Sequence, residues 1–200
     1  MPEEQKRTGE EERTTAETSV EARICIDGEG EADVETGLGF LDHMLELLAK
    51  HAQFDLYCRA DGDLHVDGHH TTEDVGIVLG TALRRALGEK KGIRRFGDAD
   101  IPMAEALASV AVDIGGRNYL SYSVEFQNTT TGGFDVELIH EFLQAFCRTA
   151  AVTLHIDVVR GSNSHHIAEA IFKGLARTLR EATSIDPRSP DEVPSTKGTL

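Results

Sequence analysis

The chain has 200 residues and a formal net charge of −15, with 35 acidic against 20 basic side chains. This length suits one sizeable domain or two small halves, and the acidic balance argues against a nucleic-acid partner. No apolar run approaches the roughly 18 residues of a membrane span, and the polar amino-terminal residues do not resemble a secretory signal. Three scattered cysteines in apolar segments predict free thiols in a reducing, cytoplasmic compartment.

The first half of the chain predicts two strands, a helix, a strand and a second helix. Residues 1–14 are acidic and polar, which predicts a disordered tail. Apolar residues then alternate as in a half-buried strand, and later recur at helical spacing. The elements expected are a strand from Thr15, a strand over 31–36 that pairs with it as a hairpin, a helix over 40–51, a strand over 54–60 and a helix that ends near Leu87.

After a basic connector over residues 88–100, the same order of elements starts again. The elements expected are strands over 107–114 and 119–126, a helix over 134–149, a strand over 152–159 and a helix to about Ala182. Residues 186–200 predict an irregular C-terminal tail that contributes to the site. The expected fold class is α+β, with internally duplicated β-β-α-β-α half-domains over 15–100 and 101–185, mainly antiparallel sheets and helices packed on one face.

A histidine-pair motif opens a predicted helix in each half. The two copies read Asp67-Gly68-His69-His70-Thr71-Thr72-Glu73 and Asn163-Ser164-His165-His166-Ile167-Ala168-Glu169. Residues four apart share a helix face, so the first histidine and the glutamate of each copy can bind one metal ion together, while the second histidine points roughly 100° away. One adjacent histidine pair is ordinarily a surface feature, but two at equivalent places predict metal sites.

The duplication also indicates further donors. The paired histidines are 96 residues apart (165 − 69), and the strands before them are 98 apart (154 − 56). At 98, His43 falls on Glu141 (141 − 43), with His140 as the competing candidate. The two predicted donor sets are His69, Glu73, Glu141 and His166, and His43, His70, His165 and Glu169. Imidazole and carboxylate donors without thiolate suit manganese, iron, cobalt or zinc.

Lys173 stands four residues after Glu169, on the same helix face. One interpretation is an ion pair between these two residues. The other is an anion pocket beside a metal, which other cations and hydroxyls would join because they are the usual phosphate ligands. The further candidates are Arg95, Arg117, Ser195, Thr196 and Lys197.

In six blocks that span nearly the whole chain beyond the amino-terminal tail, the sequence resembles the imidazoleglycerol-phosphate dehydratase family of histidine biosynthesis. The blocks are Arg13–Thr18, Gly39–Leu45, Asp67–Asp74, Lys91–Gly97, Asn163–Lys173 and Pro194–Gly198. The resemblance implies a hydro-lyase that dehydrates D-erythro-imidazole glycerol phosphate to imidazole acetol phosphate by way of a dimetal-bound imidazolate. It further implies two Mn²⁺ per active site, other divalent ions being possible, and a 24-subunit homo-oligomer with sites between subunits. The charge and the lack of a long apolar run predict no nucleic-acid or membrane partner.

The resemblance also implies roles for particular residues. The metal ligands would be His43, His69, His70, Glu73, Glu141, His165, His166 and Glu169. The phosphate ligands would be Arg95, Arg117, Lys173 and Ser195, with Lys197 in the same tail. Glu17 matches an acidic residue near the reacting carbons and is expected to move a proton. The expected catalytic set is Glu17, His43, His70, Glu73, His165 and Glu169.

Two positions depart from the family pattern. Family members carry histidine or glutamate at position 141, and often have Met-Asp-Glu where this chain has Met103-Ala104-Glu105. Ala104 is expected to be peripheral. Two other functions use the same duplicated motif: a dinuclear metallohydrolase that releases phosphate from esters, and a non-enzymatic shell in which metal ions only join subunits.

Overall fold

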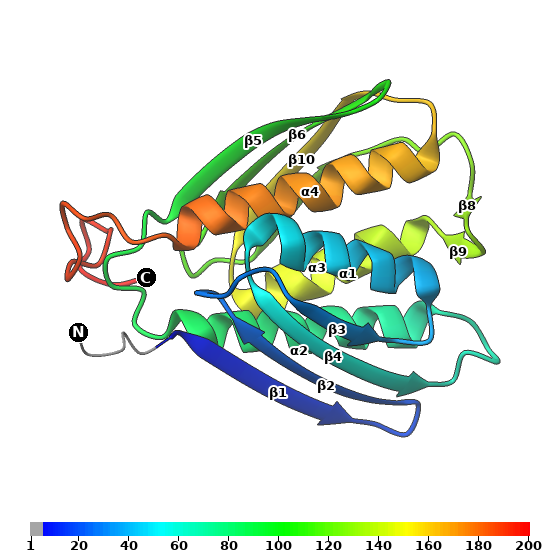
Figure 1. Cartoon of the computed structure of the whole chain (residues 1–200), viewed down its shortest axis with the longest axis horizontal. Coiled ribbons are helices and arrows are strands. Elements are labelled where there is room, and N and C mark those ends of the chain that lie inside the picture. Colours follow the sequence, from blue (N-terminus) through cyan, green and yellow to red (C-terminus); the bar gives the residue numbers. More distant parts are fainter. Residues whose placement is uncertain (1–5) are drawn as a thin grey trace.

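The computed structural model describes residues 6–200, and it contains two four-stranded sheets with the long helices gathered between them (Figure 1). The first sheet has the order β1-β2-β4-β3. Its strands are β1 (Thr8–Thr14), β2 (Thr18–Cys25), β3 (Ala32–Glu35) and β4 (Asp55–Gly62). The second sheet has the order β5-β6-β10-β7. Its strands are β5 (Phe96–Met103), β6 (Ala106–Asp113), β7 (Tyr119–Ser123) and β10 (Thr153–Arg160).

The helices cover the inner face of each sheet. They are α1 (Gly39–Ala52), α2 (His69–Leu87), α3 (Glu137–Ala150) and α4 (Ser164–Thr183). Helix α2 packs on β1 and β2, α4 packs on β5 and β6, and the pairs α1·α4 and α2·α3 join the two halves. The predicted α+β class, with mainly antiparallel sheets and helices on one face of each, is therefore confirmed.

The duplication is visible element by element. Helices α1 and α3 have 14 residues each and start 98 residues apart (137 − 39). Each ends at a left-handed residue, Gln53 at φ 57° and Ala151 at φ 56°. Strand β2 alternates buried and open residues as predicted, with Val20 and Ala22 at 1% and 0% exposure. Equivalent backbone conformations at equivalent positions show that the two halves share the same local fold.

Each half has an edge strand that the sequence does not predict. Thr8–Thr14, predicted as part of a disordered tail, forms β1 at the edge of the first sheet, so that prediction is wrong there; residues 1–5 of the predicted tail lie outside the described residues. Phe96–Met103 forms the equivalent edge strand β5, which starts within the predicted connector. Strand β1 has no apolar side chain, and in β5 only Gly97 is buried, so neither strand shows the buried apolar alternation that identifies a half-buried strand.

Two further local predictions are wrong. Residues 31–36 do not form a hairpin with the preceding strand, because β3 pairs in parallel with β4. Phe134–Asp135 is not the start of a helix but a short strand, β9, which pairs with β8 (Thr130–Thr131). The irregular C-terminal tail is as predicted, with neither helix nor strand over residues 186–200.

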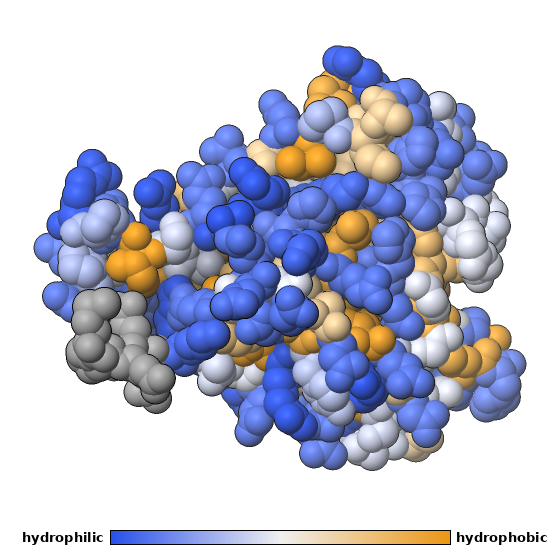
Figure 2. Space-filling model, in the orientation of Figure 1, coloured by the Kyte–Doolittle hydropathy of each residue, from blue (hydrophilic) through white to orange (hydrophobic). Residues whose placement is uncertain are grey.

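The surface and core agree with the composition. Figure 2 shows hydrophilic residues over most of the visible face, as a strongly acidic chain leads one to expect. Cys58 and Cys147 are buried free thiols as predicted, and burial raises the pKa of each to about 12, while Cys25 is half-buried. Among the described helices, none is long and apolar enough to cross a bilayer.

Two equivalent glycines let each edge strand lie directly on its helix. A Cβ added to Gly9 would lie 2.1 Å from Ala82 O, and one added to Gly97 would lie 2.2 Å from Thr178 O. The glycines are 88 residues apart (97 − 9) and their helix contacts 96 (178 − 82). Because both partners are backbone atoms, no side-chain rotation can relieve the overlap.

We predict that Gly97→Ala destabilises the protein by about 1–3 kcal/mol or more, because β5 must move away from α4. Gly39→Ala is the matched control, since nothing lies within 4 Å of an added Cβ there; it should leave stability unchanged or slightly raised. The check is the urea midpoint of each variant at equal protein concentration. Equal midpoints for the two alanine variants would contradict the close-approach explanation.

Candidate functional site

All four long helices begin at the same end of the molecule, at the right of Figure 1. The predicted metal donors lie in the first two turns of these helices, so the fold gathers them at that end. At the starts of α2 and α4, the side chain two residues before the first histidine of the motif accepts from backbone amides. Asp67 Oδ1 accepts from the His69 amide at 2.8 Å, and Asn163 Oδ1 accepts from the His165 and His166 amides at 2.9 and 3.3 Å. These hydrogen bonds fix the first turns that carry the histidine pairs.

Three of the predicted donors form a cluster within one chain. His43 Nε2 lies 3.2 Å and His165 Nε2 3.0 Å from the same oxygen, Glu169 Oε1. One donor atom from each of the three lies within 4.8 Å of the others, close enough to share a metal ion. Helix α1 supplies His43 and α4 supplies the other two, so the cluster joins two helices. His43 is therefore not a core histidine, and its side chain is 39% exposed.

Glu169 is the buried centre of this cluster, with 8% of the residue exposed. Burial raises its pKa, but donation from Lys173 and contacts with His43 and His165 outweigh that effect and lower the pKa to about 2. Lys173 Nζ donates to Glu169 Oε2 at 2.5 Å, so the ion pair considered for these residues is present. An ionised carboxylate between two imidazoles suits a divalent cation, since the three side chains together offer one negative and two neutral donors.

The second histidine of each motif, His70 in the first half and His166 in the second, is called the spare histidine. In the first half, a carboxylate lies close to one ring nitrogen of this residue. His70 Nδ1 lies 3.0 Å from Asp63 Oδ2 and 3.8 Å from Glu17 Oε2. The hydrogen bond to Asp63, together with the charge of Glu17, raises the pKa of His70. Sequence reasoning missed Asp63, which follows β4 directly and has no equivalent acid in the second half.

The spare histidine of the second half is held in the same way. His166 Nδ1 lies 2.7 Å from Glu105 Oε2, and Glu105 Oε1 also accepts from the backbone amides of Ser162 and Asn163. The bond to His166, followed by the amide bonds, lowers the pKa of Glu105 to about 2. Glu105 directly follows Ala104, the position expected to be peripheral, and contacts a predicted ligand.

The remaining donors do not meet in one chain. Glu73 Oε1 accepts from Arg148 at 3.1 Å, and Glu141 lies 3.3 Å from His140 Nδ1. The predicted set of His69, Glu73, Glu141 and His166 is thus not assembled within the described part of a single copy, and His70 stays outside the cluster around Glu169. These assignments remain predictions that depend on a second copy.

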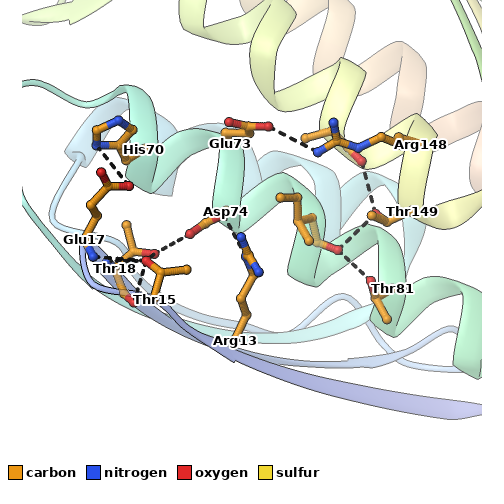
Figure 3. A network of polar contacts seen from close by, with 12 residues as sticks. Arg13, Thr15, Glu17, Thr18, His70, Glu73, Asp74, Thr81, Arg148 and Thr149 are labelled. Carbon is orange, nitrogen blue, oxygen red and sulfur yellow. Dashed lines mark hydrogen bonds and ion pairs between the residues drawn. The ribbon is translucent and has the colours of Figure 1, made fainter.

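Glu17 sits in a turn that a half-buried ion pair between Arg13 and Asp74 attaches to α2 (Figure 3). Asp74, 7% exposed, accepts from Arg13 Nε at 2.9 Å and from the Thr18 hydroxyl. Thr15 Oγ1 accepts in turn from the Glu17 and Thr18 amides at 3.1 and 3.0 Å. The network fixes the turn relative to the helix that carries His70, while the Glu17 side chain itself stays 56% exposed.

The predicted phosphate ligands lie mostly at the other end of the molecule. Arg95, Arg117, Ser195 and Lys197 line one pocket, together with residues of the C-terminal tail. Arg95 is fixed there by two bonds to Asp113, at 2.7 and 3.1 Å, and by one to Pro194 O. Its amide donates to Ala182 O, near the end of α4. Ala182 is 13 residues beyond Glu169 (182 − 169), which is about 20 Å along a helix. Only Lys173 lies beside the histidine cluster.

The family model for imidazoleglycerol-phosphate dehydratase matches residues 36–179 of this chain. A protein from Azorhizobium caulinodans with that name is 57% identical over 188 residues, covering 94% of this chain and 95% of its own length. Its namesake from Methylorubrum extorquens is 54% identical over 194 residues, covering 97% and 100%.

Solved structures give the same result. Imidazoleglycerol-phosphate dehydratase from Staphylococcus aureus superposes with a TM-score of 0.81 at 41% identity, covering 90% of this chain and 99% of that one. The enzyme from Pyrococcus furiosus superposes with a TM-score of 0.81 at 39% identity, covering 95% and 100%.

We predict that His165→Ala weakens Mn²⁺ binding to the metal-free protein by at least about 100-fold, because residues that only support a ligand already cost 10–100-fold. The matched control is His155→Ala, an exposed histidine on β10 outside the cluster, which should stay within twofold of the parent. The check is titration of Mn²⁺ followed by the spectroscopic signal of the free ion. Equal loss in both variants would show that the cluster does not bind metal.

Proposed function

The chain belongs to the imidazoleglycerol-phosphate dehydratase family, and we propose that it is a hydro-lyase that converts imidazole glycerol phosphate to imidazole acetol phosphate in histidine biosynthesis. The observation that carries this proposal is identity of 54–57% with proteins of that name over at least 94% of the chain. The cluster of His43, His165 and Glu169 supports it, because the sequence predicted these three as ligands of one ion. A metallohydrolase or a purely structural shell has no comparable support.

The reaction removes a hydroxyl group from the carbon attached to the imidazole ring and a proton from the neighbouring carbon. The enol that results rearranges to the ketone. The carbon-bound proton is a poor acid, so the ring must supply electrons to expel the hydroxyl group. Two divalent ions at each site, manganese by the resemblance, would supply Lewis acidity that favours the imidazolate form of the ring.

The donors divide into two sets. His43, His165 and Glu169 would hold one ion, completed by His70 from another copy. His69, Glu73, Glu141 and His166 would hold the other. Arg148 bonds Glu73 in one copy at 3.1 Å and would release it on binding. Six ligand positions per ion leave room for substrate beside four protein donors.

We infer that each site lies between copies of this chain in a large homo-oligomer, for which the resemblance indicates 24 subunits. The donor sets are incomplete in one copy, and the pocket with Arg95 and Arg117 lies about 20 Å along α4 from Glu169. A substrate made of one ring, three carbons and a phosphate is too short to reach both. Val66 and Val159, 61% and 56% exposed, precede the two motifs and fit a surface that a second copy covers.

The cations would bind the substrate phosphate. Arg117 and Lys197 line the pocket with Ser195, and Lys173 stands beside the histidine cluster. Binding energy at the phosphate would orient the reacting carbons, which are remote from it. Glu17 would move the carbon-bound proton, since its carboxylate is exposed and lies in a turn fixed to α2.

The direct test is to incubate Mn²⁺-loaded protein with imidazole glycerol phosphate and follow the keto product. We expect the ketone to form, and expect a chelator to abolish the activity and added Mn²⁺ to restore it. Release of inorganic phosphate without ketone would instead favour the metallohydrolase.

The shared site has its own test in mixed assemblies. We predict that His165→Ala and Arg117→Ala chains are each inactive alone, because each lacks one part of every site. When they are dissociated and reassembled together, some sites receive an intact metal set from one chain and an intact pocket from the other. Partial recovery of turnover is expected; no recovery in well-formed mixed assemblies would place the whole site within one chain.

A further inference from the structure

The turn between the first two strands of each half carries a glutamate at the same position. Glu17 lies between β1 and β2, and Glu105 lies between β5 and β6. They are 88 residues apart (105 − 17), the offset that also relates the start of β2 to that of β6 (106 − 18). Gly9 and Gly97, which contact α2 and α4, share this offset (97 − 9). Glu17 and Glu105 are therefore duplicates of one ancestral residue.

Both glutamates face the spare histidine of their own half. Glu105 Oε2 is 2.7 Å from His166 Nδ1, and Glu17 Oε2 is 3.8 Å from His70 Nδ1, where Figure 3 shows its carboxylate beside the imidazole. The first contact is a hydrogen bond and the second is too long for one. The two glutamates thus occupy equivalent positions, but only Glu105 is hydrogen-bonded to its histidine.

Asp63 accounts for the difference. Its Oδ2 is 3.0 Å from His70 Nδ1, so it occupies the position that Glu105 takes on His166. The equivalent residue in the second half is Gly161 (161 − 63 = 98), which has no side chain to offer. Glu105 is also bound by the amides of Ser162 and Asn163, at 3.2 and 2.8 Å, whereas the Glu17 side chain is 56% exposed.

We propose that the two glutamates have divided an ancestral role. Glu105 is a positioning residue that holds His166 with Nε2 presented to a metal ion. Glu17 is free to move a proton because Asp63 has replaced it on His70. This inference rests on the proposed function for the metal and proton roles, but its metal part is measurable without substrate.

The chemistry of the contact determines which nitrogen is free. A carboxylate only accepts hydrogen bonds, so Nδ1 of His166 must carry the proton and Nε2 keeps its lone pair. Both Glu105 oxygens act as acceptors, Oε2 2.7 Å from His166 Nδ1 and Oε1 from the Ser162 and Asn163 amides at 3.2 and 2.8 Å. A carboxylate on the far nitrogen of a metal-binding histidine fixes both the ring and the tautomer.

Glu105→Gln distinguishes this role from simple support of the loop. The glutamine oxygen can still accept from Ser162 and Asn163, but its NH₂ group then faces His166 Nδ1. That nitrogen must accept, which moves the proton to Nε2 and blocks the metal. We expect Glu105→Gln to raise the apparent Kd for Mn²⁺ about 10–100-fold, and at least as much as Glu105→Ala does. A loop-supporting role predicts the reverse order, because glutamine keeps the loop contacts.

The other half should respond differently. Glu17→Gln should leave Mn²⁺ affinity within about twofold, and should lower turnover about 10²–10⁴-fold, the usual contribution of a positioned acid or base. Glu12→Gln, an exposed position on β1, is the matched control and should change neither quantity.

Asp63→Gly makes the first half resemble the second. Glu17 can then approach His70, so Mn²⁺ affinity should be largely kept while turnover falls. Adding Glu17→Gln to that variant should weaken Mn²⁺ binding as Glu105→Gln does. Full turnover in Asp63→Gly would overturn the idea that Asp63 frees Glu17.

The outcomes separate this inference from the proposed function. If wild-type protein makes no ketone, the dehydratase proposal fails, whereas the Mn²⁺ titrations still test Glu105. If the ketone forms but Glu105→Gln binds Mn²⁺ like wild type, the division of roles is wrong. Weakening of Mn²⁺ binding by Glu17→Gln equal to that by Glu105→Gln would also overturn it.

Discussion

The contact of the buried Glu169 carboxylate with two imidazoles is the constraint on which the rest of the site depends. His43 and His165 both meet Glu169 Oε1, at 3.2 and 3.0 Å, and Lys173 takes the other oxygen. A buried anion is costly unless it is paired and hydrogen-bonded. The arrangement therefore requires α1 and α4 to begin side by side, which the α1·α4 packing between the two sheets provides.

Duplication explains why a small fold can provide so many donors, and divergence explains why the halves are not interchangeable. Both halves keep three features. These are the histidine pair at the start of a helix, the glycine through which the edge strand contacts that helix, and the glutamate in the turn between the first two strands. They differ at three pairs of equivalent positions in or near the site. Asp63 corresponds in the repeat to Gly161 and His43 to Glu141, while Lys173 corresponds to the uncharged Ile77. The half with Lys173 supplies two of the three residues of the assembled cluster, and the half with Asp63 has the exposed acid.

The sequence predicts the helices, the inner strands and the duplicated motif well, because each has a strong periodic or repeated pattern. It does not predict β1, which is polar, or β5, in which only Gly97 is buried, because these edge strands lack a buried apolar alternation. It identifies His43 and Glu169 as partners through the repeat alone. It misses Glu105 and Asp63, since a lone carboxylate far from the motif carries no local pattern. The offset of 88 between Glu17 and Glu105 is the signal that points to Glu105; Asp63 has no repeat partner, so only the folded chain reveals it.

In the proposed site, donors from more than one copy surround each pair of ions. The most direct measurement is the structure of the Mn²⁺-loaded assembly, with the ions located by their anomalous scattering. We predict two ions per site, one bound by His43, His165 and Glu169 with a histidine from another copy, and Glu73 turned from Arg148 to the second ion. A single ion held within one copy, with Glu73 still paired to Arg148, would contradict this prediction.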